Sequence, residues 1–237
     1  MNAFFFGASD RPLFGVYEPP KGHDLRVGAV ICNAVGPEYY QSHRACRALA
    51  RRMSGSGAHV LRFDYLGTGD SGGEVHELRV ADWLANVEQA IDELKDMTVL
   101  DSVAVVGLRA GASLAAGAAG RRDDVSRLVL WDPCTTVAGP MPETGADSFP
   151  QPFLEELFEL GLSGDGGQES ADTLVVVTEA EWATSATADG TGPYAASGYT
   201  VRRVPGPLPW MERGDFGGGG LPVAALDEIV AWITHTA

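Results

Sequence analysis

Cysteine is scarce in this sequence, and long hydrophobic runs are missing. The 237 residues include only Cys32, Cys46 and Cys134, and none of them has the C-x-x-C spacing of a metal-binding or redox motif. An odd number of cysteines at unrelated spacings predicts free thiols in a reducing compartment. No apolar run approaches the roughly 18 residues of a membrane span, and the apolar run at 4–6 is too short for a signal peptide. We therefore expect a cytoplasmic protein with no membrane-spanning segment.

Basic residues are also few. Lys and Arg total 17 against 32 Asp and Glu, which gives a net charge of −15. This balance disfavours binding to nucleic acid or to an anionic membrane surface. The glycine-rich stretch 66–73 has neither the Lys of a phosphate-binding loop nor G-x-G-x-x-G spacing, and Asp70 within it would repel phosphate. We expect no metal, no cofactor, no nucleic acid and no membrane among the partners.

A strand, a sharp turn and a helix are predicted at 101–118. The β-branched run at 103–106 leads into Gly-Leu-Arg-Ala-Gly at 107–111, and an Ala/Leu-rich helical segment follows. Two glycines around a tight strand-to-helix turn are typical of a nucleophile elbow, G-x-S-x-G, which presents its central side chain at the carboxyl edge of a parallel sheet. Here that central residue is Arg109. A guanidinium stays protonated and has no lone pair, so it serves neither as nucleophile nor as general base.

The remaining apolar segments alternate between strand and helix patterns and predict one α/β domain over 1–237. Segment 135–171 is rich in Pro, Gly, Glu and Ser, with one amphipathic piece at 153–160, and predicts a small lid. The strands are expected at 2–19 (an edge hairpin), 27–32, 58–65, 103–106, 126–131, 172–178 and 199–204. The helices are expected at 42–53, 80–94 and 223–233.

Four stretches together carry a family resemblance. They are NAVGPEYYQSHRACRALARRM at 33–53, LRFDYLGTGDSGG at 61–73, VVGLRAGASLAA at 105–116 and LVLWDP at 128–133. Nearly the whole chain resembles the α/β-hydrolases, which have a mostly parallel central sheet with helices on both faces. It is most similar to the serine-aminopeptidase-like branch that includes hydrolases associated with exosortase systems. That branch contains members with G-L-R-x-G at the elbow.

The resemblance implies where the other members of a catalytic triad would lie. The acid would follow the strand ending near Thr178 or the one ending at Trp131, and the candidates are Glu179, Glu181 and Asp132. The base would be a His after the last strand, but VPGPLPWMERG at 204–214 contains none and has Leu or Pro at 208–209. The triad therefore lacks both its Ser and its His. His43 and His76, on segments leaving the active edge, are the remaining candidate imidazoles.

Three functions stay open for such a site. An isolated buried cation is unfavourable, so Arg109 needs an anionic partner, which is either a protein carboxylate or the substrate. In a non-hydrolytic enzyme, Arg109 and the amides of Ala34 and Ala110 would stabilise developing negative charge. The reaction would be a cyclisation, isomerisation, elimination or decarboxylation of a small carbonyl or carboxylate compound in metabolism. The acids or bases that would move a proton are Asp132, Glu179, Glu181, His43 and Tyr39.

The two alternatives use the same edge of the sheet. In one, Cys32 or Cys134 is a displaced nucleophile of an esterase, thioesterase or acyltransferase. In the other, the fold binds an anionic ligand or a partner protein without catalysis. The remaining candidates for oxyanion or substrate contacts are Asn33, Leu108 and Trp210, and a homodimer stays open.

Overall fold

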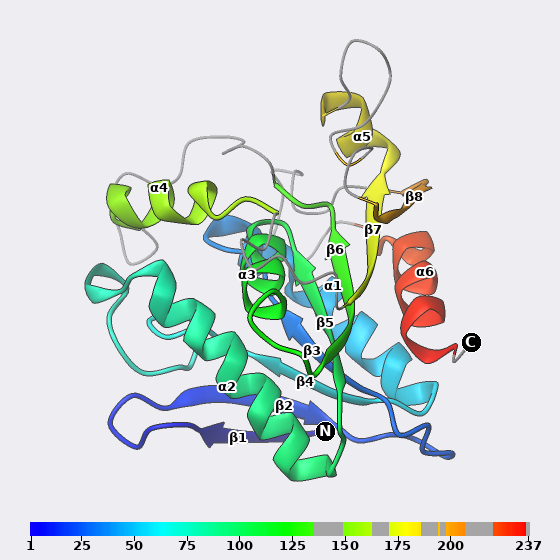
Figure 1. Cartoon of the computed structure of the whole chain (residues 1–237), viewed down its shortest axis with the longest axis horizontal. Coiled ribbons are helices and arrows are strands. Elements are labelled where there is room, and N and C mark those ends of the chain that lie inside the picture. The colour runs from blue at the N-terminus through cyan, green and yellow to red at the C-terminus, as the bar shows by residue number, and fades with distance from the viewer. Residues whose placement is uncertain (135–148, 163–170, 186–193, 195–197, 207–219, 236–237) are drawn as a thin grey trace.

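An eight-stranded sheet is the centre of the fold in the computed structural model, which describes residues 1–134, 149–162, 171–185, 194, 198–206 and 220–235 (Figure 1). The strand order is β1-β2-β4-β3-β5-β6-β7-β8. The strands are β1 (Asn2–Phe6), β2 (Leu13–Glu18), β3 (Gly28–Cys32), β4 (His59–Phe63), β5 (Val103–Leu108), β6 (Val125–Trp131), β7 (Asp172–Thr178) and β8 (Thr200–Val204). The predicted α/β-hydrolase fold class, a mostly parallel sheet with helices on both faces, is confirmed.

The hairpin at the N-terminal edge is antiparallel, and the rest of the sheet is parallel. β1 pairs with β2, and β2 pairs with β4, in antiparallel register. From β4 to β8 every neighbouring pair is parallel. The central strands β3 and β5 are buried along their whole length, as their continuous apolar sequences predict for strands covered on both faces.

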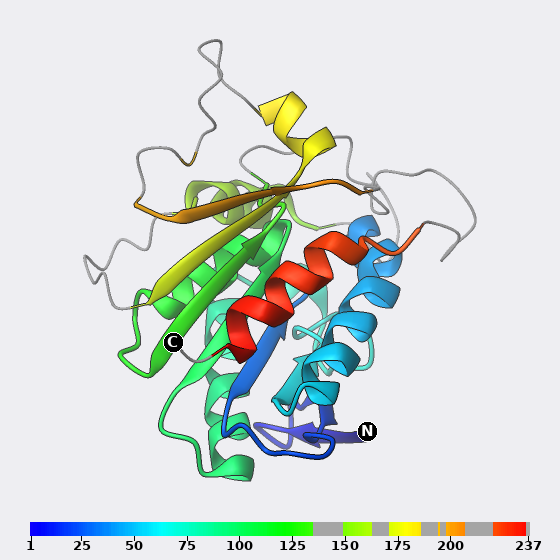
Figure 2. The same ribbon diagram turned by 90° about the vertical axis from the view of Figure 1, so that its right-hand side faces the viewer.

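Helices cover both faces of the sheet (Figure 2). One face packs against α1 (Pro37–Gly55) and α6 (Val223–Thr234), which lie side by side. The other face packs against α2 (Val80–Thr98) and α3 (Ala110–Ala119), and α4 (Gln151–Glu159) packs on these two helices. A short helix, α5 (Glu179–Ser185), follows β7, and a single 3-10 turn, η1 (Val75–Glu77), precedes α2. None of the helices within the described ranges has the length and apolar character needed to cross a bilayer.

The described part of the predicted lid is packed against the domain. Phe153 and Leu157 of α4 are buried, and the Phe153 ring meets the Trp83 ring of α2 edge-on at 4.7 Å between centroids. Residues 135–148 and 163–170 of the insertion lie outside the described residues. The lid and the single-domain boundaries therefore stay predictions.

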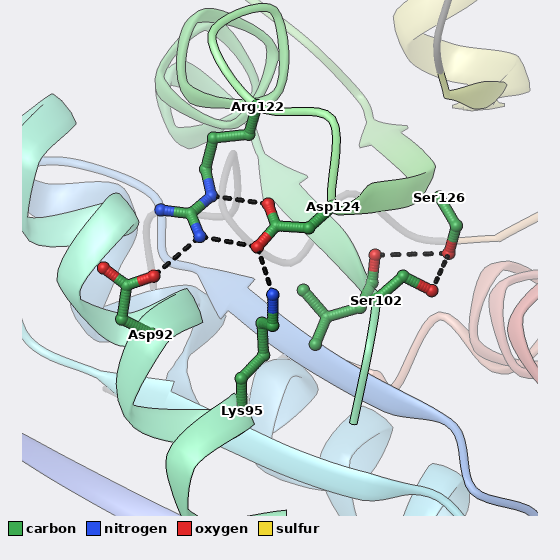
Figure 3. Close-up of polar contacts among 7 residues, drawn as sticks. Asp92, Lys95, Ser102, Arg122, Asp124 and Ser126 are labelled. Carbon is green, nitrogen blue, oxygen red and sulfur yellow. Dashed lines mark hydrogen bonds and ion pairs between the residues drawn. The ribbon is translucent and has the colours of Figure 1, made fainter. Parts of the chain in front are cut away.

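An ion-pair network joins α2 to the segment that enters β6 (Figure 3). This segment lies at the amino end of β6, whereas Arg109 follows the carboxyl end of the neighbouring parallel strand β5. Arg122 binds Asp124 through two nitrogens at 2.6 and 2.7 Å and also reaches Asp92 at 2.6 Å. Lys95 binds the same Asp124 carboxylate at 2.5 Å. These contacts fix α2 against the sheet at a distance from the candidate site.

Candidate functional site

The turn between β5 and α3 has the strained backbone of an elbow. Arg109 lies at its apex with φ 56° and ψ −124°, a conformation that residues with a Cβ rarely adopt. A Cβ on Gly111 would overlap the carbonyl oxygens of Asn33 and Cys32, and one on Gly107 would overlap the backbone of Ala112. The two glycines therefore let the loop after β3 and helix α3 approach the turn closely.

The Arg109 guanidinium is buried among protein acceptors. Its side chain is 1% exposed, and its Nε donates to Glu38 Oε1 at 3.1 Å. One terminal nitrogen lies 3.1 Å from Glu181 Oε2 and donates to the Asp132 carbonyl oxygen at 3.0 Å. Burial opposes the charge, but the surrounding groups, with Cys134 and the carboxylates of Glu38 and Glu181 foremost, raise the pKa of Arg109. The protein itself thus supplies the anionic partner that the sequence requires.

Asp132, at the end of β6, is the most buried carboxyl of this group. It is fully buried, and its Oδ1 accepts hydrogen bonds from the Thr178 amide at 2.7 Å and the Thr178 hydroxyl at 3.3 Å. Its other oxygen, Oδ2, has no hydrogen-bond partner among the described residues. Burial raises the pKa of Asp132 to about 7, although Thr178 and Arg109 act in the opposite direction. Asp132 therefore exchanges a proton near neutral pH.

The local charge balance around the elbow is negative. Three carboxyl groups, on Glu38, Glu181 and Asp132, surround the single guanidinium of Arg109. Burial and the neighbouring Glu181 raise the pKa of Glu38, while Arg109 lowers it. Because the cation is already compensated, an added anionic ligand would face net repulsion.

The cysteines at this edge are poor candidates for a thiolate. Cys32 is fully buried in the core, and burial raises its pKa to about 12. Cys134 lies near Arg109, which lowers its pKa, yet burial outweighs that effect and the pKa is again about 12. Both thiols stay protonated at neutral pH, which disfavours the hypothesis of a displaced cysteine nucleophile.

A cavity of about 190 Å³ lies between the loops that follow β3 and β4, and Tyr39 in its wall is the residue next to Glu38 in the sequence. Its described lining residues are Ala34, Val35, Gly36, Tyr39, Tyr40, Tyr65, Gly67, Thr68, Gly69, Val75, Trp83 and Phe149. Tyr39 donates its hydroxyl hydrogen to Asp64 Oδ1 at 2.7 Å. Asp64 is itself 9% exposed, and its Oδ2 accepts the Asp70 amide at 3.1 Å. Of the predicted site residues that the structure describes, Ala34 and Tyr39 line this cavity.

The structure brings some predicted site residues together and separates others. Arg109, Asp132 and Glu181 form one cluster, whereas Glu179 is exposed at the start of α5. His43 lies on the solvent side of α1, with its ring centroid 6.4 Å from that of Tyr39. Partial desolvation and the nearby charge of Arg62 lower the pKa of His43. The side-chain amide of Asn33 donates to the Phe63 carbonyl oxygen. Leu108 is buried in the core, and Ala110 is the first residue of α3. His76 is exposed in η1. Trp210 and positions 208–209 lie outside the described residues.

Sequence reasoning missed Glu38 and Asp64. Glu38 follows Gly36-Pro37 in the first turn of α1, where a carboxylate also meets the positive end of the helix. Asp64 follows β4 directly, at the same sheet edge as the elbow. The signal that would have identified them is an acidic residue directly after a parallel strand, for Asp64, or directly after a Gly-Pro helix start, for Glu38.

Comparison with known proteins agrees with this architecture. A family model described as serine aminopeptidase, S33, matches residues 39–160. No curated protein matches the chain. Est1E from Butyrivibrio proteoclasticus, solved with ferulic acid, superposes with a TM-score of 0.66 at 15% identity, covering 98% of this chain and 96% of that one.

Two further solved structures have the same fold. A protein from Xanthomonas campestris described as an α/β serine hydrolase without lid has a TM-score of 0.65 at 15% identity, with 100% and 96% coverage. A thioesterase domain from the curacin biosynthetic pathway has a TM-score of 0.57 at 15% identity, with 99% coverage of both chains. At these identities the likeness concerns the fold. The family model, in contrast, spans more than half of the sequence, and the chain therefore belongs to the serine aminopeptidase S33 family of α/β-hydrolases.

Proposed function

We propose that this chain is a non-hydrolytic member of its family, in which a buried ion-pair cluster closes the elbow and the neighbouring cavity binds a small molecule. One observation carries the proposal. Arg109 occupies the nucleophile position of the elbow, is 1% exposed, and is paired with Glu38 and Glu181. A side chain that is permanently charged and enclosed in this way has no electron pair to attack an ester or peptide carbonyl.

The absence of a triad His in the sequence after β8 supports the same proposal. No His occurs at 204–214, so the segment that would supply the base of a serine hydrolase offers no imidazole. The exosortase-associated branch and a cytoplasmic location remain our predictions from the sequence. An anionic ligand is less favoured than the sequence alone indicates, because the carboxylates around Arg109 already compensate its charge.

The test is to treat the folded protein with a fluorophosphonate probe and with a panel of p-nitrophenyl esters. We expect no covalent adduct in the intact mass and no ester cleavage above that of a buffer blank. Stoichiometric labelling of any Ser, with turnover, would overturn the proposal. An Arg109→Ser variant serves as a comparison, because restoring the hydroxyl without a His should leave the protein inactive.

A second candidate function is proton transfer at Asp132. It is favoured by the buried Oδ2 atom, which has no partner in the described part of the chain, and by a pKa of about 7, which suits a general acid or base. Here the Asp132 carboxyl would accept and return the proton of a small neutral carbonyl compound, and the amides of Ala34 and Ala110 would stabilise its enolate. NMR in D2O with cyclohexanone, a neutral ketone whose α protons exchange slowly in buffer at pH 7, tests it: accelerated exchange that is lost in Asp132→Asn would favour this function over binding alone, and exchange at the buffer rate would contradict it.

A further inference from the structure

Two of the hydroxyl groups in the cavity wall, those of Tyr39 and Thr68, are committed as donors. Tyr39 gives its hydrogen to Asp64 Oδ1 at 2.7 Å, and Thr68 gives its hydrogen to the Tyr65 carbonyl oxygen at 2.8 Å. A hydroxyl group has a single hydrogen but two lone pairs. Toward a ligand, these two oxygens therefore act as acceptors, and a ligand group that binds between them must bring donors.

The described wall of the cavity has no basic residue: neither Lys, Arg nor His is among the residues that line it. The Asp64 carboxyl lies behind Tyr39, and it packs so closely under Gly69 that a Cβ there would overlap it. Burial raises the pKa of Asp64, and the hydrogen bonds from Tyr39 and the Asp70 amide oppose this. Arg62, the buried cation that interacts with Asp64, also interacts with Glu18 and does not line the cavity. A positive charge in the cavity would thus be favoured and a negative one opposed.

The remaining wall is aromatic and apolar. The rings of Tyr65 and Trp83 stack with centroids 4.5 Å apart, and the Phe149 ring meets Trp83 edge-on at 5.5 Å. Val75 adds an aliphatic surface. The volume of about 190 Å³ is below the roughly 300–1,000 Å³ of pockets for drug-sized ligands, so one ring with a short chain fits best.

We propose that the cavity binds a small aromatic amine in its protonated form, with the ring against Phe149 and Val75 and the ammonium group donating to the Tyr39 and Thr68 oxygens. This inference rests on the proposed function, because it takes the cavity to be a ligand site. An ammonium group brings three donors and a positive charge, which matches both the acceptor hydroxyls and the buried carboxyl. The electron-rich faces of nearby aromatic rings also attract a cation.

Three molecules of nearly equal shape test the inference: 2-phenylethylamine, 2-phenylethanol and phenylacetate. Binding is measured by titration calorimetry and ligand-observed NMR at pH 7. We expect the amine to bind at least tenfold more tightly than the alcohol, and phenylacetate to bind most weakly. In Tyr39→Phe the preference for the amine should fall about tenfold, because an acceptor is lost. Tyr199→Phe is the matched control, since the Tyr199 hydroxyl bonds to the Leu162 carbonyl oxygen and does not line the cavity.

The outcomes separate this inference from the proposed function. If the alcohol or phenylacetate binds as well as the amine, the amine assignment is wrong and the cavity remains a ligand site. If none of the three binds at millimolar concentration, the cavity is no site for such ligands and both proposals about it fail. Should Tyr39→Phe not fold, as judged by circular dichroism, Thr68→Val removes the other acceptor and gives the same comparison.

Discussion

Arg109 and Glu38 are 71 positions apart in the sequence, yet the Arg109 Nε donates to Glu38 Oε1 at 3.1 Å in the fold. The contact joins the elbow between β5 and α3 to the first turn of α1. Glu38 thereby takes part in two favourable interactions, with the guanidinium and with the positive end of its own helix. The contact joins the two segments that would form an oxyanion hole in a hydrolase. Removing a carboxylate partner of Arg109 should therefore lower the stability of the fold.

The ion pair with Glu181 should stabilise the fold, and Glu179 provides a matched control on the same helix. We expect Glu181→Gln to lower the free energy of unfolding by about 1–3 kcal/mol, because a buried guanidinium loses a charged partner. Glu179→Gln, at an exposed position, should change it by less than about 0.5 kcal/mol. Urea unfolding at pH 7 measures both. Equal effects of the two variants would contradict the assignment of Glu181.

Asp132 should make the stability depend on pH. Its folded pKa of about 7 exceeds its unfolded value, so the folded state binds more protons between about pH 4 and 7. The free energy of unfolding contributed by Asp132 is therefore largest at low pH and decreases as the pH rises through that window. Asp132→Asn removes this term, and we expect the variant to gain up to ~4 kcal/mol relative to the wild type between pH 4 and 8. A difference that stays constant with pH would show that Asp132 titrates normally.

The three thiols should be unreactive in the native protein. With a pKa of about 12, only about one Cys134 side chain in 10⁵ is a thiolate at pH 7, and the same holds for Cys32 and Cys46. We expect chloroacetamide to modify the folded protein at least 100-fold more slowly than the protein in 6 M guanidinium chloride, where all three should react. Rapid modification of one cysteine in the folded state would revive the displaced-nucleophile hypothesis.

Gly111 should be sensitive to the addition of a single methyl group. In Gly111→Ala the new Cβ would overlap the Asn33 carbonyl oxygen, and the loop after β3 would have to move. We expect a loss of about 1–3 kcal/mol in unfolding free energy. Gly55→Ala, at the end of α1 with open space around it, should be neutral or stabilising by up to ~1 kcal/mol. Thermal and urea unfolding compare the two variants, and similar effects would rule out close packing at the elbow.

Asp124 should stabilise the protein at pH values above the pKa that its carboxyl group has in the unfolded chain. Its hydrogen bonds with Arg122 hold its pKa well below the ordinary value, so its contribution is present above about pH 4 and is lost as the pH falls below that. Asp124→Asn should destabilise by about 1 kcal/mol at pH 7 in low salt, a modest figure because solvent screens these partly exposed groups. Asp123→Asn, at an exposed neighbouring position, is the control. If 0.5 M salt leaves the difference between the two variants unchanged, the network is not electrostatic.

The sequence predicted most of the sheet because burial on both faces has a strong local signature. The run at 27–32 is continuously apolar and forms β3, and the predicted strand 172–178 coincides with β7. Boundaries were less well predicted where polar residues continue a helix. The helix expected to begin at residue 42 begins at Pro37, and the segment after β7, for which no helix was predicted, forms α5. Neither 37–41 nor 179–185 has apolar residues repeating at helical spacing, so the hydrophobic pattern gave no signal there.

The sequence by itself determined that an arginine occupies the elbow and that segment 204–214, directly after the last strand, contains no histidine. Both are facts of residue type, and they set what chemistry is available. Only the tertiary structure decided the partners of Arg109, because Glu38 and Glu181 approach it from positions 71 residues before and 72 residues after it. The pKa of Asp132 was likewise set by the fold, since desolvation depends on what surrounds a group in space and not on its neighbours along the chain.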